Sequence, residues 1–149
     1  MRIGLRVALV GCFFSGLAGF ASADGLYRVE APVLEGKTLF DQQLNGTSKV
    51  TVKPHASSEA SGDTDVLSQC LWSVDVQLES GNVTLVPGKM ICVGPQQEVL
   101  EAIPVGTVVS FGQCSNSACS QYQVAGNTTV SMTLSEPIEF SVQARNERN

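Results

Sequence analysis

Among the residue types in this chain of 149 residues, cysteine most clearly suggests a chemical role. Beyond the N-terminal segment, the sequence contains Cys70, Cys92, Cys114 and Cys119. Thiol groups can ligate metal ions, act as nucleophiles or join in disulfides. Cys70 and Cys92 are each eleven residues from Gly81. This symmetry is expected when a disulfide joins the two strands of a hairpin whose turn lies at Gly81.

Residues 72–79 alternate apolar and polar side chains, a pattern typical of a strand with one buried face. Ser80 and Gly81 then supply a two-residue turn. The turn predicts two apolar cross-strand pairs, Leu78 with Val83 and Val76 with Leu85.

Continued without interruption, this register places Cys70 opposite Ile91, one residue before Cys92. The segment 86–88, Val-Pro-Gly, offers a correction, because proline cannot donate to the ladder and glycine suits a bulge. One extra residue there brings Cys70 opposite Cys92. We therefore predict a disulfide that closes a bulged hairpin.

The segment 108–124 predicts a second hairpin, closed around the four loop residues Ser115, Asn116, Ser117 and Ala118. Its register pairs Phe111 with Tyr122, Val109 with Val124, and Cys114 with Cys119. The apolar pairs share one face, and the two cysteines are opposed at the mouth of the loop.

A redox-active dithiol is the chemical alternative for Cys114 and Cys119. Such dithiols ordinarily have two residues between the cysteines and belong to a βαβ unit, and neither feature is present here. We interpret the pair as a structural disulfide. The loop it closes, residues 115–118, is then the candidate surface for binding a protein partner.

His55 is the only histidine in the chain, and it lies at the start of the polar segment 54–65, which we expect to be a mobile loop. A histidine away from an ordered nucleophile and an acidic partner does not indicate a Ser-His-Asp or Cys-His catalyst. Asp63 and Asp65, with Glu59 nearby, allow a calcium loop as an alternative, but a calcium site needs about six or more oxygen ligands and a sharply defined turn, so a solvated acidic loop is favoured. We predict no catalytic residue, no metal site and no cofactor.

Other residues that could act in catalysis or binding are explained more simply by a structural role or by chance. No pair among the fourteen acidic residues is marked out for glycoside hydrolysis. Trp72, Phe111 and Tyr122 could stack on a ligand, but each belongs to an alternating apolar stripe, which favours packing in the core. The glycosylation sequons at Asn45, Asn82 and Asn127 matter only in a host that glycosylates.

The first 23 residues predict a secretory signal peptide: two arginines, an apolar run, and Ala-Ser-Ala before Asp24. An alternative is lipidation of Cys12, which follows Leu-Val-Gly. That cleavage would leave several apolar residues on the mature chain. We therefore expect residues 24–149 to be one exported domain, periplasmic or secreted, in which an even number of cysteines forms disulfides.

Charge and hydropathy exclude two classes of partner. Arg2 and Arg6 leave with the signal peptide, so the mature chain of 126 residues has seven basic and fourteen acidic side chains, a net charge of −7. A chain with no basic patch is not expected to bind nucleic acid. The mature chain also has no second apolar stretch long enough to span a membrane.

The strand patterns predict an all-β fold. About nine short strands with Gly, Pro and Asn at the turns favour a single β-sandwich with two hairpin disulfides, and a partly open β-barrel is the alternative. Residues 95–103 favour one helical or irregular turn, although Val99, Glu101 and Ile103 also fit a strand.

Two functions are compatible with these features. The first is a non-enzymatic exported domain that binds a protein partner or contributes to an envelope or surface assembly. The second is an inhibitor of a secreted hydrolase that presents residues 115–118 as a preordered loop.

Overall fold

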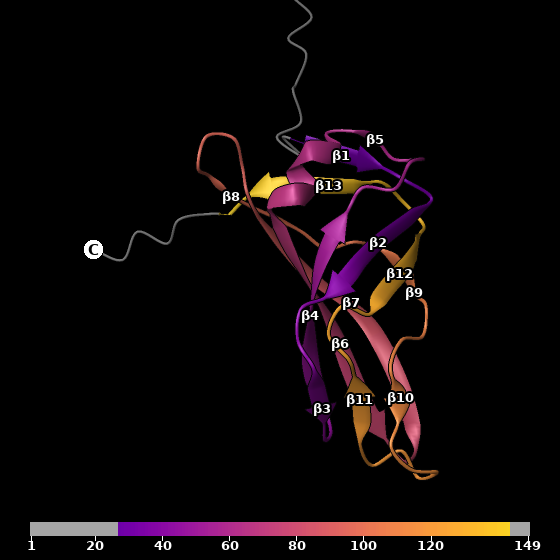
Figure 1. Cartoon of the computed structure of the whole chain (residues 1–149). Coiled ribbons are helices and arrows are strands. Elements are labelled where there is room, and N and C mark those ends of the chain that lie inside the picture. Colours follow the sequence, from indigo (N-terminus) through magenta and orange to yellow (C-terminus); the bar gives the residue numbers. More distant parts are fainter. Residues whose placement is uncertain (1–26, 144–149) are drawn as a thin grey trace, which may run out of the picture.

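The computed structural model describes residues 27–143, which contain thirteen β-strands and one short 3-10 helix (Figure 1). In chain order they are β1 (Tyr27–Glu30), β2 (Val33–Thr38), β3 (Gln42–Leu44), β4 (Ser48–His55), β5 (Ser61–Gly62), η1 (Thr64–Gln69), β6 (Cys70–Glu79), β7 (Asn82–Val93), β8 (Val99–Ala102), β9 (Gly106–Val108), β10 (Gln113–Cys114), β11 (Tyr122–Val124), β12 (Thr129–Leu134) and β13 (Ile138–Val142). The predicted signal peptide and Cys12 lie outside the described residues.

The strands form two antiparallel sheets. Ten of them follow the order β5-β1-β13-β8-β7-β6-β4-β2-β12-β9, and the other three the order β10-β11-β3. The large sheet curls so that its last strand, β9, returns beside β7. No ladder joins β9 to β7 in the described chain, so the large sheet does not close into a barrel.

The small sheet covers the distal half of the β6–β7 hairpin, as Figure 1 shows. Its buried side chains, Leu44, Tyr122 and Val124, belong to one core cluster with the partly buried Leu78 and Leu85. Two β-layers around one apolar core confirm the predicted sandwich.

The β6–β7 hairpin confirms the predicted register. Leu78 pairs with Val83, and Val76 with Leu85. At the turn, Ser80 has φ 50° and Gly81 has φ 80°, which matches a type I′ turn and the right-handed twist of the flanking strands.

The predicted bulge is also present, because the pairing shifts between Trp72 and Val74. Gly88 lies so close to β6 that a Cβ atom there would be 2.9 Å from the carbonyl oxygen of Ser73. The shift brings Cys70 opposite Cys92, and a disulfide joins them.

Aromatic residues pack in the interior. Trp72 and Phe140 are fully buried, and Phe111 and Tyr122 are 5% and 2% exposed. The interpretation of Trp72, Phe111 and Tyr122 as core residues is thus confirmed.

The helical or irregular turn expected in residues 95–103 is present only at the start of this segment, where the Gln97 N–H donates to the Gly94 carbonyl (3.0 Å). Residues 99–102 form β8, which pairs with β7 on one side and β13 on the other. Leu100 and Ala102 alternate inward, so burial between two partner strands outweighs the local preference for helix. About nine strands were expected, and the four additional ones are β3, β5, β8 and β9.

Residues 54–65 contain more regular structure than the predicted loop. Pro54 and His55 complete β4, residues 61–62 form β5, and η1 begins at Thr64. The polar composition of the segment did not predict these strands, because they are held by backbone hydrogen bonds to other parts of the chain. Residues 54–55 pair with β2, and residues 61–62 pair with β1.

Candidate functional site

The Cys114–Cys119 disulfide closes an exposed loop at one end of the sandwich. Ser115, Asn116, Ser117 and Ala118, the candidate partner-binding residues, are all exposed, whereas Cys119 is buried. Within the loop, the Asn116 carboxamide accepts a hydrogen bond from the Ser120 N–H (3.1 Å) and donates one to the Ser120 hydroxyl (2.7 Å). The disulfide and this side chain therefore restrict the loop from two directions.

The predicted register of the second hairpin is wrong, although its disulfide is correct. Cys114 pairs with Tyr122, and Gln113 with Gln123, so Cys119 lies within the loop rather than in the ladder. Cys119 has φ 48°, and its N–H donates to the Asn116 carbonyl in a tight turn. The connection between β10 and β11 therefore covers residues 115–121. The prediction placed residues 119–121 in the returning strand, but they belong to this turn and the connection.

Val109 shows the same error. We expected it to face Val124 on an apolar stripe, but Val109 is 53% exposed while Val124 is buried. The Val109 N–H donates to Ser131 of β12 instead (2.8 Å). The chain thus continues β9 at this point and reaches the small sheet only at Gln113.

The disulfide loop lies against the turn of the β6–β7 hairpin. A Cβ atom built at Gly81 would be 3.2 Å from the carbonyl oxygen of Ala118. Two hairpin tips that are distant in sequence therefore support each other at this end of the molecule.

A groove, which we call the seam groove, opens where β7 and β9 lie side by side without a ladder. It is lined by the apolar side chains of Val83, Leu85, Val108 and Tyr122 and by the neutral polar residues Ser110 and Gln113. Its volume is about 370 Å³, and it has no charged lining residue. Sequence reasoning did not find this groove, because it brings together strands that no local pattern connects.

Tyr122 gives the seam groove a buried polar group. Its hydroxyl has no hydrogen-bond partner of ordinary geometry within the described chain, although the side chain is almost fully buried. Burial raises the pKa of Tyr122, and a side-chain hydrogen bond from Ser110, outside ordinary geometry, lowers this pKa by a smaller amount. The phenol therefore stays neutral at physiological pH and keeps a proton to donate.

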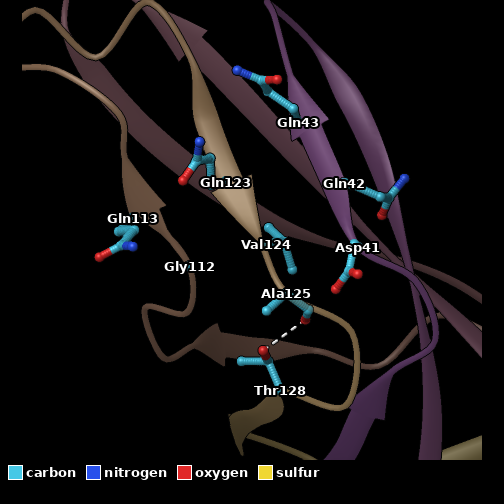
Figure 2. A pocket seen from close by; sticks show the side chains of 9 residues that line it. All are labelled: Asp41, Gln42, Gln43, Gly112, Gln113, Gln123, Val124, Ala125 and Thr128. Atoms are coloured by element: carbon cyan, nitrogen blue, oxygen red, sulfur yellow. Dashed lines mark hydrogen bonds between the residues drawn. The ribbon is translucent and has the colours of Figure 1, made fainter.

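A second groove, of about 650 Å³, lies on the outer face of the small sheet. Figure 2 shows Gln43, Gln123 and Gln113 on three neighbouring strands, and the ladder pairs them directly across from one another. The Gln43 amide also donates to Gln121 (2.7 Å). This face presents a row of neutral amide groups next to the disulfide loop.

The outer face of β6, β7 and β8 is an exposed apolar surface. Leu71 and Ile91 are paired across the two strands and are 48% and 46% exposed. Val93 and Val99 continue the surface on β7 and β8. A depression of about 640 Å³ on this face is lined in part by Leu71, Ile91 and Val93. Contiguous exposed apolar side chains of this kind are typical of surfaces that pack against another molecule.

His55 has an acidic neighbour, contrary to expectation. It pairs with Glu35 of β2, and its Nε2 lies 3.4 Å from the Glu35 carboxylate. Both side chains are about half exposed. Pairing between β2 and β4 brings them together, which a loop assignment for residue 55 could not reveal.

The calcium loop that Glu59, Asp63 and Asp65 allowed as an alternative has no cluster of ligands in the described residues. The Asp63 carboxylate accepts a hydrogen bond from the Arg28 N–H (2.8 Å) and so joins β1 to the start of η1. Within residues 27–143, no group of three or more His, Cys, Asp and Glu side chains is gathered as metal ligands would be.

Comparisons with protein-family models, with curated proteins and with solved structures gave no match. In the described part of the chain, no helix has the length and apolar content needed to cross a membrane. The two disulfides are typical of proteins that fold in an oxidising environment.

Proposed function

We propose that this chain is a non-enzymatic exported domain that binds a protein partner through the end of the sandwich bearing the Cys114–Cys119 loop. The observation that carries the proposal is the support of this loop from two sides, by its own disulfide and by the Gly81 turn. A loop that is already ordered loses less conformational entropy on binding than a free one.

Export is part of the proposal and is supported by two features. The N-terminal 23 residues have the pattern of a signal peptide. The four cysteines of the described chain are all in disulfides, which persist in oxidising compartments.

The test is site-specific crosslinking in the native envelope. A photo-crosslinking amino acid at Ser117 should capture one dominant partner, whereas the same group at Thr133, also exposed but on β12, should not. Serine at both Cys114 and Cys119 should reduce the Ser117 adduct while the domain stays folded. Equal capture from both positions would contradict binding through the loop.

The exposed, restrained loop also supports a second candidate, an inhibitor of a secreted hydrolase. Inhibitors of this kind bind with little backbone rearrangement. Tight one-to-one binding and loss of activity in a panel of secreted proteases and glycosidases would favour the inhibitor. Concentration-dependent assembly with envelope components would favour the first candidate.

A further inference from the structure

The seam groove lies between two strand edges that lack ladder partners. β8 pairs with β7 only at residues 90–93, so the stretch of β7 next to β9 is paired with β6 alone. On the other side, β9 is the last strand of the large sheet and β10 is an edge of the small one. Unpaired strand edges readily accept an additional strand.

The connection between β9 and β10 exposes more unpaired backbone. Among the described residues, Ser110, Phe111 and Gly112 make no backbone–backbone hydrogen bond, although the flanking Val109 and Gln113 are held by β12 and β11. Phe111 is buried, but Ser110 and Gly112 are exposed. The N–H and C=O groups of these two residues are accessible to an incoming chain, and each unmade bond favours a ligand that can complete it.

The lining of the groove restricts the chemistry of that ligand. Val83, Leu85 and Val108 offer apolar contact, and no lining side chain is charged, although the whole chain has a net charge of −5. A charged group would lose its hydration here without gaining a counter-ion. An uncharged segment with small apolar side chains is complementary to these walls.

The hydroxyl of Tyr122 adds a directional requirement. It is buried, lacks a partner of ordinary geometry, and belongs to a side chain that lines the groove. A buried donor of this kind costs free energy until an acceptor reaches it. A backbone carbonyl of a bound strand is such an acceptor.

We infer that the seam groove binds an extended, uncharged segment of the partner protein, which adds as a strand along residues 110–112, places apolar side chains over Val83 and Leu85, and accepts a hydrogen bond from the Tyr122 hydroxyl. This inference rests on the proposed function as a protein-binding domain and identifies the chemistry of the partner. The segment would bridge the gap that β9 and β7 leave in the curled sheet.

The first experiment uses the full chain and a blocked synthetic peptide of about seven residues, the length of an ordinary strand, that alternates valine and serine. Calorimetry should detect binding, and hydrogen exchange at Ser110 and Gly112 should slow about tenfold or more when the peptide is bound. The same peptide with glutamate in place of valine should not bind.

N-methylated peptides test backbone pairing directly. Alternate N–H groups of a strand point to opposite sides, so two peptides methylated in alternate registers present different edges to the protein. One should lose about tenfold or more in affinity, and the other should retain most of it. Equal binding by both methylated peptides and the parent would overturn the inference.

Two variants test the protein side. Tyr122→Phe keeps the ring and removes only the hydroxyl, so it should stay folded and bind the peptide about fivefold more weakly. Leu85→Lys should weaken binding about tenfold or more, whereas the control Ile91→Lys, on the outer face of the same strand, should not. Unchanged binding by both Tyr122→Phe and Leu85→Lys would overturn the inference, as would failure of the parent peptide to bind at millimolar concentration.

The two proposals can fail separately. If Ser117 captures a partner in the envelope but the peptide neither binds nor protects residues 110–112, the strand-binding inference is wrong and the proposed function stands. If the peptide binds as described but Ser117 captures nothing, the loop is not the partner surface and the seam groove remains a peptide site.

Discussion

Gly81, in the turn of the first hairpin, lies against Ala118 of the disulfide loop, with 3.2 Å between an added Cβ atom and the Ala118 carbonyl oxygen. The same glycine has φ 80°. Its position therefore has two requirements, one for a positive φ and one for space. Gly46 has φ 84° but no atom near its Cβ position, so it satisfies only the first.

Substitution by alanine separates these requirements. Gly46→Ala should cost about 1 kcal/mol through backbone strain alone. Gly81→Ala should cost this amount plus about 0.5 to 1 kcal/mol, because the restrained loop must move away from the new methyl group. Urea denaturation measures both values.

A double-mutant cycle checks the cause of the difference. With serine at both Cys114 and Cys119, the loop can shift more easily, so the extra cost at Gly81 should fall toward the Gly46 value. An extra cost that is unchanged in this background would show that the loop contact is not its source.

The two disulfides should contribute to different properties. In the chain-entropy model, removing Cys70–Cys92 with alanine at both positions should cost roughly 3 kcal/mol, since the crosslinked residues are 22 apart. Removing Cys114–Cys119 should cost about 2 kcal/mol, since these residues are only 5 apart.

Affinity for the captured partner should follow the opposite order. Loss of Cys114–Cys119 should weaken binding in the folded protein, whereas loss of Cys70–Cys92 should weaken it only as far as the domain unfolds. Melting temperature and affinity measured on both double mutants make the comparison. If the Cys114, Cys119 mutant keeps full affinity, partner binding occurs on another surface.

How much of the fold could be predicted depends on the length of each local pattern. The first hairpin has long alternating strands and a two-residue turn, so a single register satisfies all its apolar positions. The second has strands of two and three residues, too short to define a register. Its disulfide prediction is correct although the register behind it is wrong, because Cys114 and Cys119 are only 5 residues apart and lie close together in any compact loop.

The seam groove and the His55–Glu35 pair could not be predicted for a different reason. Val83 and Ser110 belong to separate hairpins, and only the curl of the large sheet brings them to one groove. Likewise, His55 meets Glu35 through the β2–β4 ladder. Local composition contains no information about which distant strands become neighbours.

His55→Ala should change the free energy of unfolding by less than about 0.5 kcal/mol. Its pair with Glu35 is at the surface, where such contacts contribute little. Thermal denaturation provides the measurement, and Glu35→Gln should behave similarly. Should His55→Ala abolish a hydrolytic activity of the purified protein, the non-enzymatic proposal would be wrong.

The stability of the domain should depend on Tyr122 at alkaline pH. Burial holds the pKa of Tyr122 above its ordinary value of 10.0 in the folded state. Well below pH 10 the folded and unfolded phenols are both neutral, and Tyr122 adds no pH dependence. As the pH rises above 10, the unfolded tyrosine releases its proton first, so the free energy of unfolding falls up to the folded-state pKa.

Tyr122→Phe should remove this part of the alkaline loss. Tyr27 is the matched control, because desolvation and a hydrogen bond to Glu98 raise its pKa as well. Tyr27→Phe should therefore leave the Tyr122 contribution in place. Urea denaturation between pH about 8 and about 11 would compare the two variants with the wild type. If Tyr122→Phe loses as much stability as the wild type over this range, the hydroxyl is solvated in the folded state. The hydroxyl would then already be hydrogen-bonded to water, and a strand in the seam groove would have no unsatisfied donor to meet.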